Sequence, residues 1–174
     1  VQTCALPILD LAKEYKSAND HDEDSFLDFL SERVTQEMCS DIEHLTSVQD
    51  SGPDSEWSRQ RMGRITASNA FIAARYKGGK ADNHVLDRIF QSKPFTSAAT
   101  SYGQATESVA RHVYFQEYKK KHKGVKLCES GLIVNNKLPH LGASPDGLIS
   151  CTCCGSGVIE IKCPYTHHYK IGRA

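Results

Sequence analysis

The chain has 174 residues, enough for one domain of ordinary size with an extension, and an apolar fraction of 39% that suits a globular protein. No apolar run approaches the length needed to cross a bilayer, and no signal-peptide core is recognisable, so we expect no membrane association. Seven cysteines, an odd number, favour an intracellular, reducing compartment (nucleus or cytoplasm) over a disulfide framework.

The net charge of zero is the sum of two oppositely charged parts. Residues 1–56 contain fourteen acidic and three basic side chains, whereas residues 57–174 contain seven acidic and eighteen basic ones. The excess of basic side chains in residues 57–174 is typical of a protein surface that binds phosphate groups. Alternatively, an acidic helix simply docks on a basic domain.

The two ends of the chain match translated sequencing adapters. We therefore expect Val1–Ile8 and Ile171–Ala174 to be adapter-derived, and the natural protein to continue past Lys170. Between these ends, residues 9–50 are predicted to form an acidic helical extension. Asp10–Asp24 is expected to be loose, and the helical period of apolar residues over Ser25–Leu45 predicts one amphipathic helix.

A second informative stretch combines arginines with hydroxyl side chains ahead of a predicted helix. Helix N-termini offer unpaired N–H groups, and arginine offers a planar fork suited to phosphate oxygens. These features predict an anion site, unless one hydroxyl is an ordinary N-cap and the arginines are solvated. The residues concerned are Arg59, Arg61, Arg64, Thr66 and Ser68.

A longer helix is predicted from about Ala98 to Lys120. On it, Glu107 shares one side with Gly103 and Tyr114 at three- and four-residue spacing, so it does not lie on a fully polar face. Such a glutamate is either a third carboxylate for a metal site, reached through water, or a structural hydrogen-bonding group. The lysine-rich end of this helix suits the helix dipole and is expected to be solvated.

The stretch from residue 141 to 164 contains the clearest chemical pattern. A hairpin with a Cys- and Gly-rich turn would return Asp146 beside Glu160, and Glu160 and Lys162 would share one face of an alternating strand over 157–162. Two carboxylates and a lysine can hold a hard cation with a general base or charge-stabilising ammonium beside it. The pattern P-D…E-x-K is typical of restriction-endonuclease-like nucleases.

Four motifs in order extend this pattern: W-x-x-x-R-x-x-R-I-T-A-S, Y-G-x-x-x-E, S-P-D-G-L and E-I-K-C-P. Together they resemble the YqaJ viral recombinase family, which is related to the phage lambda-type alkaline exonucleases, over Trp57 to about Tyr165. The resemblance implies an α/β fold of the PD-(D/E)xK type, with a central mixed sheet flanked by helices. Residues 51–170 would form this nuclease domain, incomplete at its C-terminus.

The same resemblance implies roles for particular residues. Glu107, Asp146, Glu160 and Lys162 would take the catalytic positions. Asp146 and Glu160 would hold Mg²⁺ or Mn²⁺ together with the Ile161 carbonyl, with Glu107 acting through water. The positions that grip a 5′-terminal phosphate are matched by Arg61, Ser68 and Ser144, with Arg64 and Thr66 beside them.

These roles imply a metal-dependent exonuclease that hydrolyses linear duplex DNA in recombination, repair or viral DNA processing. The family resemblance also implies that the chain binds DNA. It further implies a strand-annealing recombinase as a partner protein and assembly into a homo-oligomer. The fragment itself could be inactive, because the family continues beyond E-I-K-C-P.

The cysteines suggest a different class of protein. Cys151, Cys153, Cys154 and Cys163 could hold a structural Zn²⁺ in a DNA-binding or interaction module without catalysis. Their spacing lacks the usual knuckle pattern on both arms, and adjacent cysteines rarely ligate one ion without strain. Reduced thiols therefore rank ahead of zinc, and the retained Asp, Glu and Lys argue against an inactive module.

Overall fold

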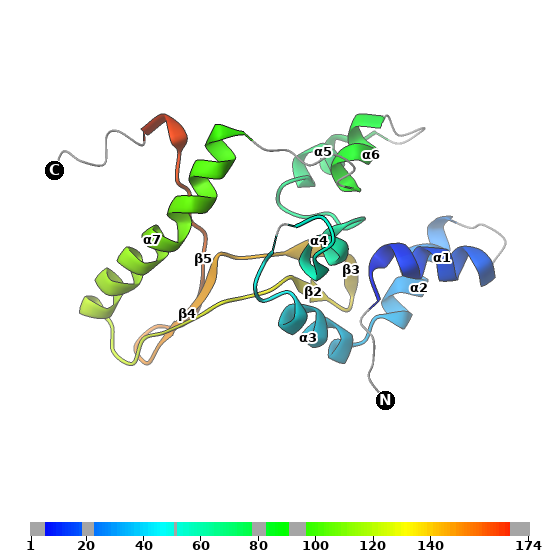
Figure 1. The fold of residues 1–174 in the computed structure, drawn as a ribbon. Helices are drawn as coiled ribbons and strands as arrows, with labels where there is room; N and C mark the ends of the chain where they lie inside the picture. The colour runs from blue at the N-terminus through cyan, green and yellow to red at the C-terminus, as the bar shows by residue number, and fades with distance from the viewer. Residues whose placement is uncertain (1–5, 19–22, 51, 78–82, 91–96, 168–174) are drawn as a thin grey trace. The chain divides into compact units, whose positions relative to one another are not determined.

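The computed structural model describes residues 6–18, 23–50, 52–77, 83–90 and 97–167 (Figure 1). The chain divides into two compact units whose segments alternate along the sequence. The first unit comprises residues 1–94 and 130–144, and the second comprises residues 95–129 and 145–174. Residues 9–50 thus share a unit with part of the predicted nuclease domain.

The first unit contains six helices and a two-stranded sheet among its described residues. The helices are α1 (Ile8–Ala18), α2 (Glu23–Arg33), α3 (Gln36–Leu45), α4 (Glu56–Arg61), α5 (Ala70–Arg75) and α6 (Asn83–Ile89). The strands β2 (Ile133–Asn135) and β3 (Leu138–Ala143) pair antiparallel. The core joins helices to this sheet through Ile8, Leu11, Leu30, Val34, Cys39, Ile42, Leu132 and Val134.

The first helix corrects the expectation that Asp10–Asp24 is loose. Residues 8–18 form α1, and Ile8 and Leu11 are 4% and 0% exposed. Residues 10–18 without Ile8 contain too few apolar positions to show a helical period, which is why the sequence suggested a loose segment. Residues 19–22 of the same prediction lie outside the described residues. The origin of residues 1–8 and 171–174 stays a prediction.

The single helix predicted over Ser25–Leu45 is two helices. The chain breaks at Thr35, whose backbone is extended (φ −86°, ψ 164°) and whose hydroxyl accepts from the Met38 N–H at 3.2 Å. Threonine at an N-cap satisfies one of the free N–H groups at the start of a helix. Val34 just before it is buried, so the apolar period continues across the break and conceals it.

Helix α3 and strand β2 approach each other very closely. The Leu132 N–H donates to Thr46 Oγ1 at 2.7 Å, and that hydroxyl donates to the Ile42 carbonyl at 2.6 Å. A Cβ on Gly131 would lie 2.0 Å from the Glu43 carbonyl oxygen. Glycine at residue 131 is therefore required by the contact itself.

The second unit consists of one long helix and a three-stranded sheet. Helix α7 (Ala98–Lys121) begins with a capping box between Ser97 and Thr100. The strands β1 (Lys126–Cys128), β4 (Gly147–Cys151) and β5 (Gly155–Ile159) pair antiparallel in the order β1-β4-β5. The 3-10 helix η1 (Tyr165–His167) follows.

The predicted mixed α/β class and the β4–β5 hairpin are confirmed. The described strands form two small antiparallel sheets, and one parallel bridge joins Ile65 to Leu141. Of the helices in the described ranges, none is long and apolar enough to span a membrane.

Candidate functional site

The first group of predicted site residues converges on the Arg61 guanidinium. Its Nη1 donates to Ser144 Oγ at 3.2 Å, and its Nη2 lies 3.3 Å from Thr66 Oγ1 and 3.4 Å from Ser68 Oγ. The hydroxyls of Thr66 and Ser68 are themselves 3.1 Å apart. The structure therefore brings together four of the five predicted phosphate-binding residues. We call Arg61, Thr66, Ser68 and Ser144 the arginine–hydroxyl cluster.

Helix α4 holds Arg61 against Trp57. The guanidinium carbon lies 4.2 Å from the centre of the indole ring, and the indole N–H donates to Ser144 Oγ at 3.2 Å. Burial lowers the pKa of Arg61, and none of the described carboxylates forms an ion pair with it. A cation held by hydroxyls and an aromatic ring, without a paired carboxylate among the described residues, has unused capacity for an anion.

Arg64 does not belong to this cluster, contrary to the prediction that it contacts a phosphate. Its side chain is 0% exposed, its Nε donates to the Pro139 carbonyl at 3.0 Å, and its Nη1 donates to both oxygens of Gln60. Burial lowers the pKa of Arg64 to about 10, and the nearby Cys39 opposes this. Arg64 therefore joins β3 to α4 from the interior.

The predicted helix start at Thr66 or Ser68 is also wrong. Helix α5 begins at Ala70, and Asn69 precedes it without a side-chain capping bond. The Asn69 side chain instead accepts from the Thr66 N–H at 2.7 Å and donates to the Arg64 carbonyl at 3.0 Å. This turn aims both hydroxyls at Arg61, so the arginine–hydroxyl cluster does not depend on a helix N-terminus.

The second group of predicted residues lies in the second unit, where β5 ends. The Asp146 N–H donates to the Ile159 carbonyl at 3.0 Å, and its Oδ2 accepts from the Ile161 N–H. Burial raises the pKa of Asp146, and the charges of Glu107 and Glu160 raise it further. The hydrogen bond from the Ile161 N–H and the charge of Lys162 lower this pKa and partly offset the rise. Burial is thus the main reason that Asp146 holds its proton more tightly than an exposed carboxyl does.

Strand β5 ends at Ile159, three residues earlier than predicted. The side chains beyond it still alternate, since Ile159 is buried, Ile161 is half-buried, and Glu160 and Lys162 are exposed. The Lys162 Nζ donates to Glu160 Oε1, and this contact raises the pKa of Lys162. Glu160 and Lys162 therefore lie on one side, as expected, although outside a regular strand.

Glu107 lies on α7, half-buried as predicted. Its Oε1 accepts from Arg111 Nη2 at 2.7 Å, and Arg111 Nη1 is 3.7 Å from Glu129 Oε1. The charge of Glu107 contributes to the raised pKa of both Asp146 and Lys162, which puts it within electrostatic range of them. We call Glu107, Asp146, Glu160 and Lys162 the acidic group.

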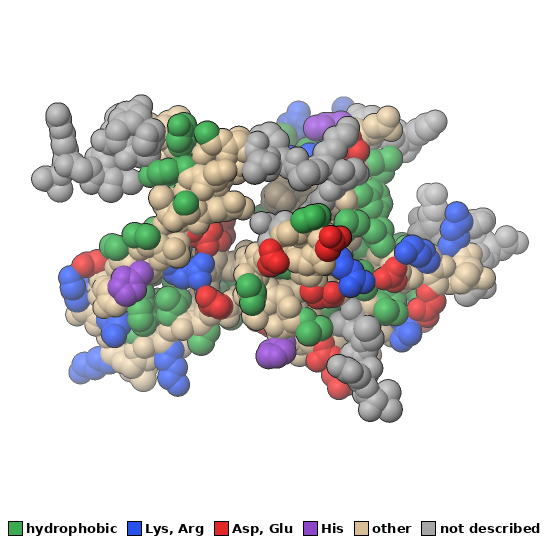
Figure 2. All heavy atoms as spheres, viewed as in Figure 1, with side chains coloured by type: hydrophobic (Ala, Val, Ile, Leu, Met, Phe, Trp, Pro, Cys, Tyr) green, Lys and Arg blue, Asp and Glu red, His purple; other side chains and the backbone are tan. Residues whose placement is uncertain are grey.

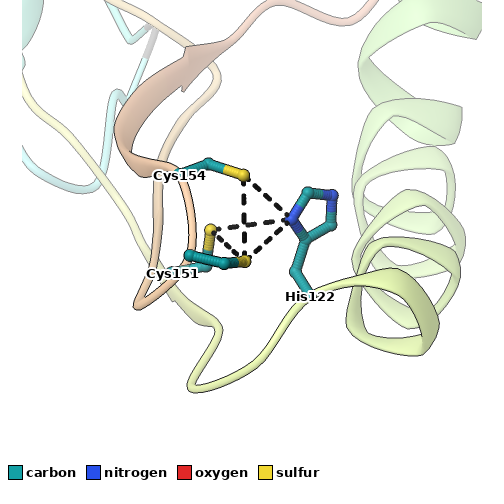
Figure 3. A group of neighbouring side chains, drawn as sticks. His122, Cys151 and Cys154 are labelled. Carbon is teal, nitrogen blue, oxygen red and sulfur yellow. Dashed lines mark hydrogen bonds between the residues drawn. The ribbon is translucent and has the colours of Figure 1, made fainter.

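A third group is a compact set of soft ligands in the second unit. His122, at the end of α7, and Cys151, Cys153 and Cys154, at the β4–β5 turn, place one ligand atom each within 4.8 Å of one another (Figure 3). Cys163, which the sequence suggested as a zinc ligand, is not in this set. His122 was missed because it is 29 residues from Cys151 and sits among lysines that read as a solvated helix end.

Comparison with known proteins assigns the chain to a family. The sequence profile of the YqaJ-like viral recombinase domain matches residues 56–174, more than half of the chain. The chain therefore belongs to this family, as its motifs indicated. Among curated proteins, none matches the sequence.

Two crystal structures of an alkaline exonuclease from Laribacter hongkongensis (LHK-Exo) are also similar to the chain. One has 30% sequence identity and a TM-score of 0.45, and the other, a complex with dAMP, has 31% and 0.47. Each comparison covers 68% of this chain and 60% of the exonuclease chain.

Proposed function

We propose that this chain carries the active centre of a metal-dependent exonuclease that hydrolyses linear duplex DNA from a 5′-phosphorylated end. The observation that carries the proposal is the acidic group, in which Asp146 and Glu160 flank the β4–β5 hairpin, Glu107 comes from α7, and Lys162 pairs with Glu160. The YqaJ-like family to which the chain belongs supports the assignment to DNA processing.

The residue types of the acidic group suit a hard divalent cation. Oxygen ligands suit Mg²⁺ or Mn²⁺, and a cation would favour the ionised form of Asp146, whose pKa burial raises. Asp146, Glu160 and the Ile161 carbonyl would hold the ion, with Glu107 acting through water. Such an ion supplies an activated water and stabilises charge on the leaving oxygen of a phosphodiester.

Lys162 is suited to act on the attacking water. Its ammonium is exposed, and its pairing with Glu160 keeps it charged and at the acidic group. From this position it would orient the water and stabilise the negative charge that develops on the phosphate. The protein residues thus divide the work between holding the cation and orienting the attacking water.

The arginine–hydroxyl cluster would bind the terminal phosphate. Arg61 provides two N–H groups on one edge, and Ser68 and Ser144 provide hydroxyls that can turn to donate to a phosphate oxygen. A terminal phosphate carries more charge than an internal one, so recognition by the half-buried Arg61 favours a phosphorylated end. The preference for a 5′ end is part of the proposal.

The test is degradation of end-labelled linear duplex DNA by this chain, and by a version extended to its natural C-terminus. Substrates with a 5′ phosphate, with a 5′ hydroxyl, and closed in a circle are compared with and without Mg²⁺ or Mn²⁺. Lys162→Ala is the test variant and Lys126→Ala the matched control. The proposal is supported if the linear, phosphorylated substrate is degraded only with metal, and if Lys162→Ala abolishes this degradation while Lys126→Ala does not.

The alternative is a DNA-binding module without catalysis. Salt-sensitive DNA binding with no cleavage by the extended protein, at any metal concentration, would favour it. Equal cleavage by the wild type and by Lys162→Ala would overturn the catalytic assignment.

A further inference from the structure

Three cysteines and one histidine of the second unit surround a single point. The His122 Nδ1 lies 3.7 Å from the Cys151 sulfur, 3.3 Å from that of Cys153 and 3.4 Å from that of Cys154. The Cys153 sulfur is 3.5 Å from that of Cys151 and 3.8 Å from that of Cys154. Figure 3 shows His122 pointing from the end of α7 at the cysteines of the hairpin.

Hydrogen bonding cannot account for this arrangement. The Nδ1 atom carries either one hydrogen or one lone pair, so it can serve one sulfur well but not three. A disulfide is excluded as well, because bonded sulfurs are about 2.05 Å apart. All six described cysteines, these three included, are free. A shared partner at the centre of the four atoms is the remaining explanation.

The distances match the edges of a tetrahedron around one zinc ion. With Zn–S at about 2.3 Å and Zn–N at about 2.05 Å, tetrahedral geometry requires S···S of ~3.8 Å and N···S of ~3.6 Å. Five of the six separations run from 3.3 to 3.8 Å, and the sixth, between the sulfurs of Cys151 and Cys154, is within 4.8 Å. Thiolate and imidazole are also the donors that zinc prefers, whereas Mg²⁺ prefers the oxygens of the acidic group.

We propose that His122, Cys151, Cys153 and Cys154 bind one structural Zn²⁺ ion, which ties the C-terminal end of α7 to the β4–β5 turn. This site goes beyond the nuclease function and does not depend on it. It also replaces the cysteine-only set that the sequence suggested, because His122 takes the position given to Cys163.

The backbone is shaped to present all four ligands. Three residues connect β4 to β5, and Gly155 at the end of the turn has φ +84°, which lets the chain curl tightly enough for adjacent cysteines to face one point. The strain expected of adjacent cysteine ligands is thus avoided by the turn.

The surroundings orient the histidine and hold the two elements together. The ring of Tyr118 stacks on that of His122 at 3.9 Å and 7°, and its hydroxyl lies 3.8 Å from the Cys151 sulfur. Thr152 donates twice to the Lys123 carbonyl, from its N–H and its hydroxyl, each at 2.9 Å. Groups that fix the orientation of a ligand in this way are usual around metal sites.

The apolar core of the second unit is small, which favours stabilisation by a bound metal ion. Its buried apolar residues, among those described, are Ile149, Cys151 and Ile159, and no residue of α7 is buried. A unit with so small a core generally needs a staple such as a metal ion to hold its elements. Three lysines occupy the last turn of α7, and Figure 2 shows Lys and Arg side chains at this end of the helix. Their positive charge would compensate the negative charge of up to three thiolates at the site.

The experiment measures zinc in the purified 174-residue chain by elemental analysis, with Co²⁺ titration as a second readout. We expect about one zinc per chain, and a Co²⁺ spectrum with the intense visible bands and thiolate charge-transfer absorption of a tetrahedral site. Cys153→Ser and His122→Ala should lose the stoichiometric zinc. Cys163→Ser and Cys128→Ser are matched controls that should keep it.

Two further measurements keep the result decisive if a variant folds poorly. Tyr118→Phe retains the ring and loses only the hydroxyl, and should weaken Co²⁺ binding by about tenfold. Stripping zinc from the wild type with a strong chelator should lower its melting temperature, and adding zinc back should restore it. Nuclease activity is not needed for any of these readouts.

The proposal is overturned if the wild type carries no stoichiometric zinc and binds Co²⁺ without a tetrahedral spectrum. It is equally overturned if the chain is isolated with a disulfide among the three cysteines that persists under mild reduction. Zinc retained in His122→Ala but lost in Cys163→Ser would restore the cysteine-only set and refute the role of His122.

Discussion

The Arg61 guanidinium donates to the hydroxyl of Ser144 at 3.2 Å, although the two residues are 83 positions apart. Ser144 follows strand β3, and Arg61 ends helix α4. The indole N–H of Trp57 donates to the same hydroxyl, so three residues from two of the motifs meet at one oxygen. The contact explains why an arginine in one motif and a serine in another belong to one cluster.

Replacing Arg61 with alanine should weaken binding to 5′-phosphorylated duplex DNA by about 10- to 100-fold, because a charge-assisted contact to the terminal phosphate is lost. Binding to a 5′-hydroxyl duplex should change much less, which makes the ratio of the two dissociation constants the measured quantity. Arg59→Ala is the control, since Arg59 is exposed and paired with Glu56. An unchanged ratio in Arg61→Ala would refute the phosphate role.

Replacing Arg64 with alanine should act on stability and not on phosphate recognition. The change leaves the buried Pro139 carbonyl and Gln60 oxygens without their donor, at a cost of about 3 kcal/mol in the free energy of unfolding. Urea denaturation of this variant beside Arg75→Ala, whose side chain is exposed, measures the difference. A stability close to wild type would show that Arg64 is not the interior link between β3 and α4.

Two glycine substitutions should have opposite effects. Gly131→Ala places a methyl group 2.0 Å from the Glu43 carbonyl oxygen and should lower the free energy of unfolding by at least about 2 kcal/mol. Gly103→Ala, on α7, meets no atom within 4 Å and should raise it by up to about 1 kcal/mol. Thermal denaturation of both variants tests this, and similar shifts in the same direction would contradict the close approach of α3 to β2.

The acidic group should make stability depend on pH in a defined direction. Burial raises the pKa of Asp146 above its ordinary 3.8, so the folded chain binds this proton more tightly than the unfolded chain. The contribution of Asp146 to stability therefore falls as the pH rises above 3.8, until its folded pKa is passed. Asp146→Asn should melt at a higher temperature than wild type at pH 7, by a margin that shrinks toward pH 4 and below.

The same variant separates stability from activity. In buffer free of Mg²⁺ and Mn²⁺ it should be the more stable protein, yet with either metal its nuclease rate should fall by more than about 100-fold, because a metal carboxylate is lost. Adding Mg²⁺ should stabilise the wild type and leave Asp146→Asn unchanged. Asp54→Asn, at an exposed position, is the control for the substitution itself. If Mg²⁺ stabilised Asp146→Asn as much as it stabilises Asp54→Asn, the ion would bind somewhere other than at Asp146.

Short-range patterns in the sequence were sufficient for the family and for much of the acidic group. The S-P-D-G-L and E-I-K-C-P motifs lie at the two outer ends of one hairpin, so strand alternation and a turn place Asp146 by Glu160 with little help from the rest of the chain. The same locality explains the correct prediction of α7, which begins at the predicted Ala98 and ends one residue beyond the predicted Lys120. The α2–α3 break was missed because an N-cap threonine can be hidden within an unbroken apolar period.

The sequence by itself determined the α/β class, the family and the residue types of the candidate sites, because helical and strand periods, hairpins and ordered motifs are encoded within a few residues. Only the tertiary structure decided which residues of one type share a site. It turned Arg61 toward three hydroxyls and buried Arg64 three residues on, and it replaced Cys163 by His122 among the soft ligands. The physical reason is that these choices rest on contacts between segments distant in sequence, whose partners no local period specifies.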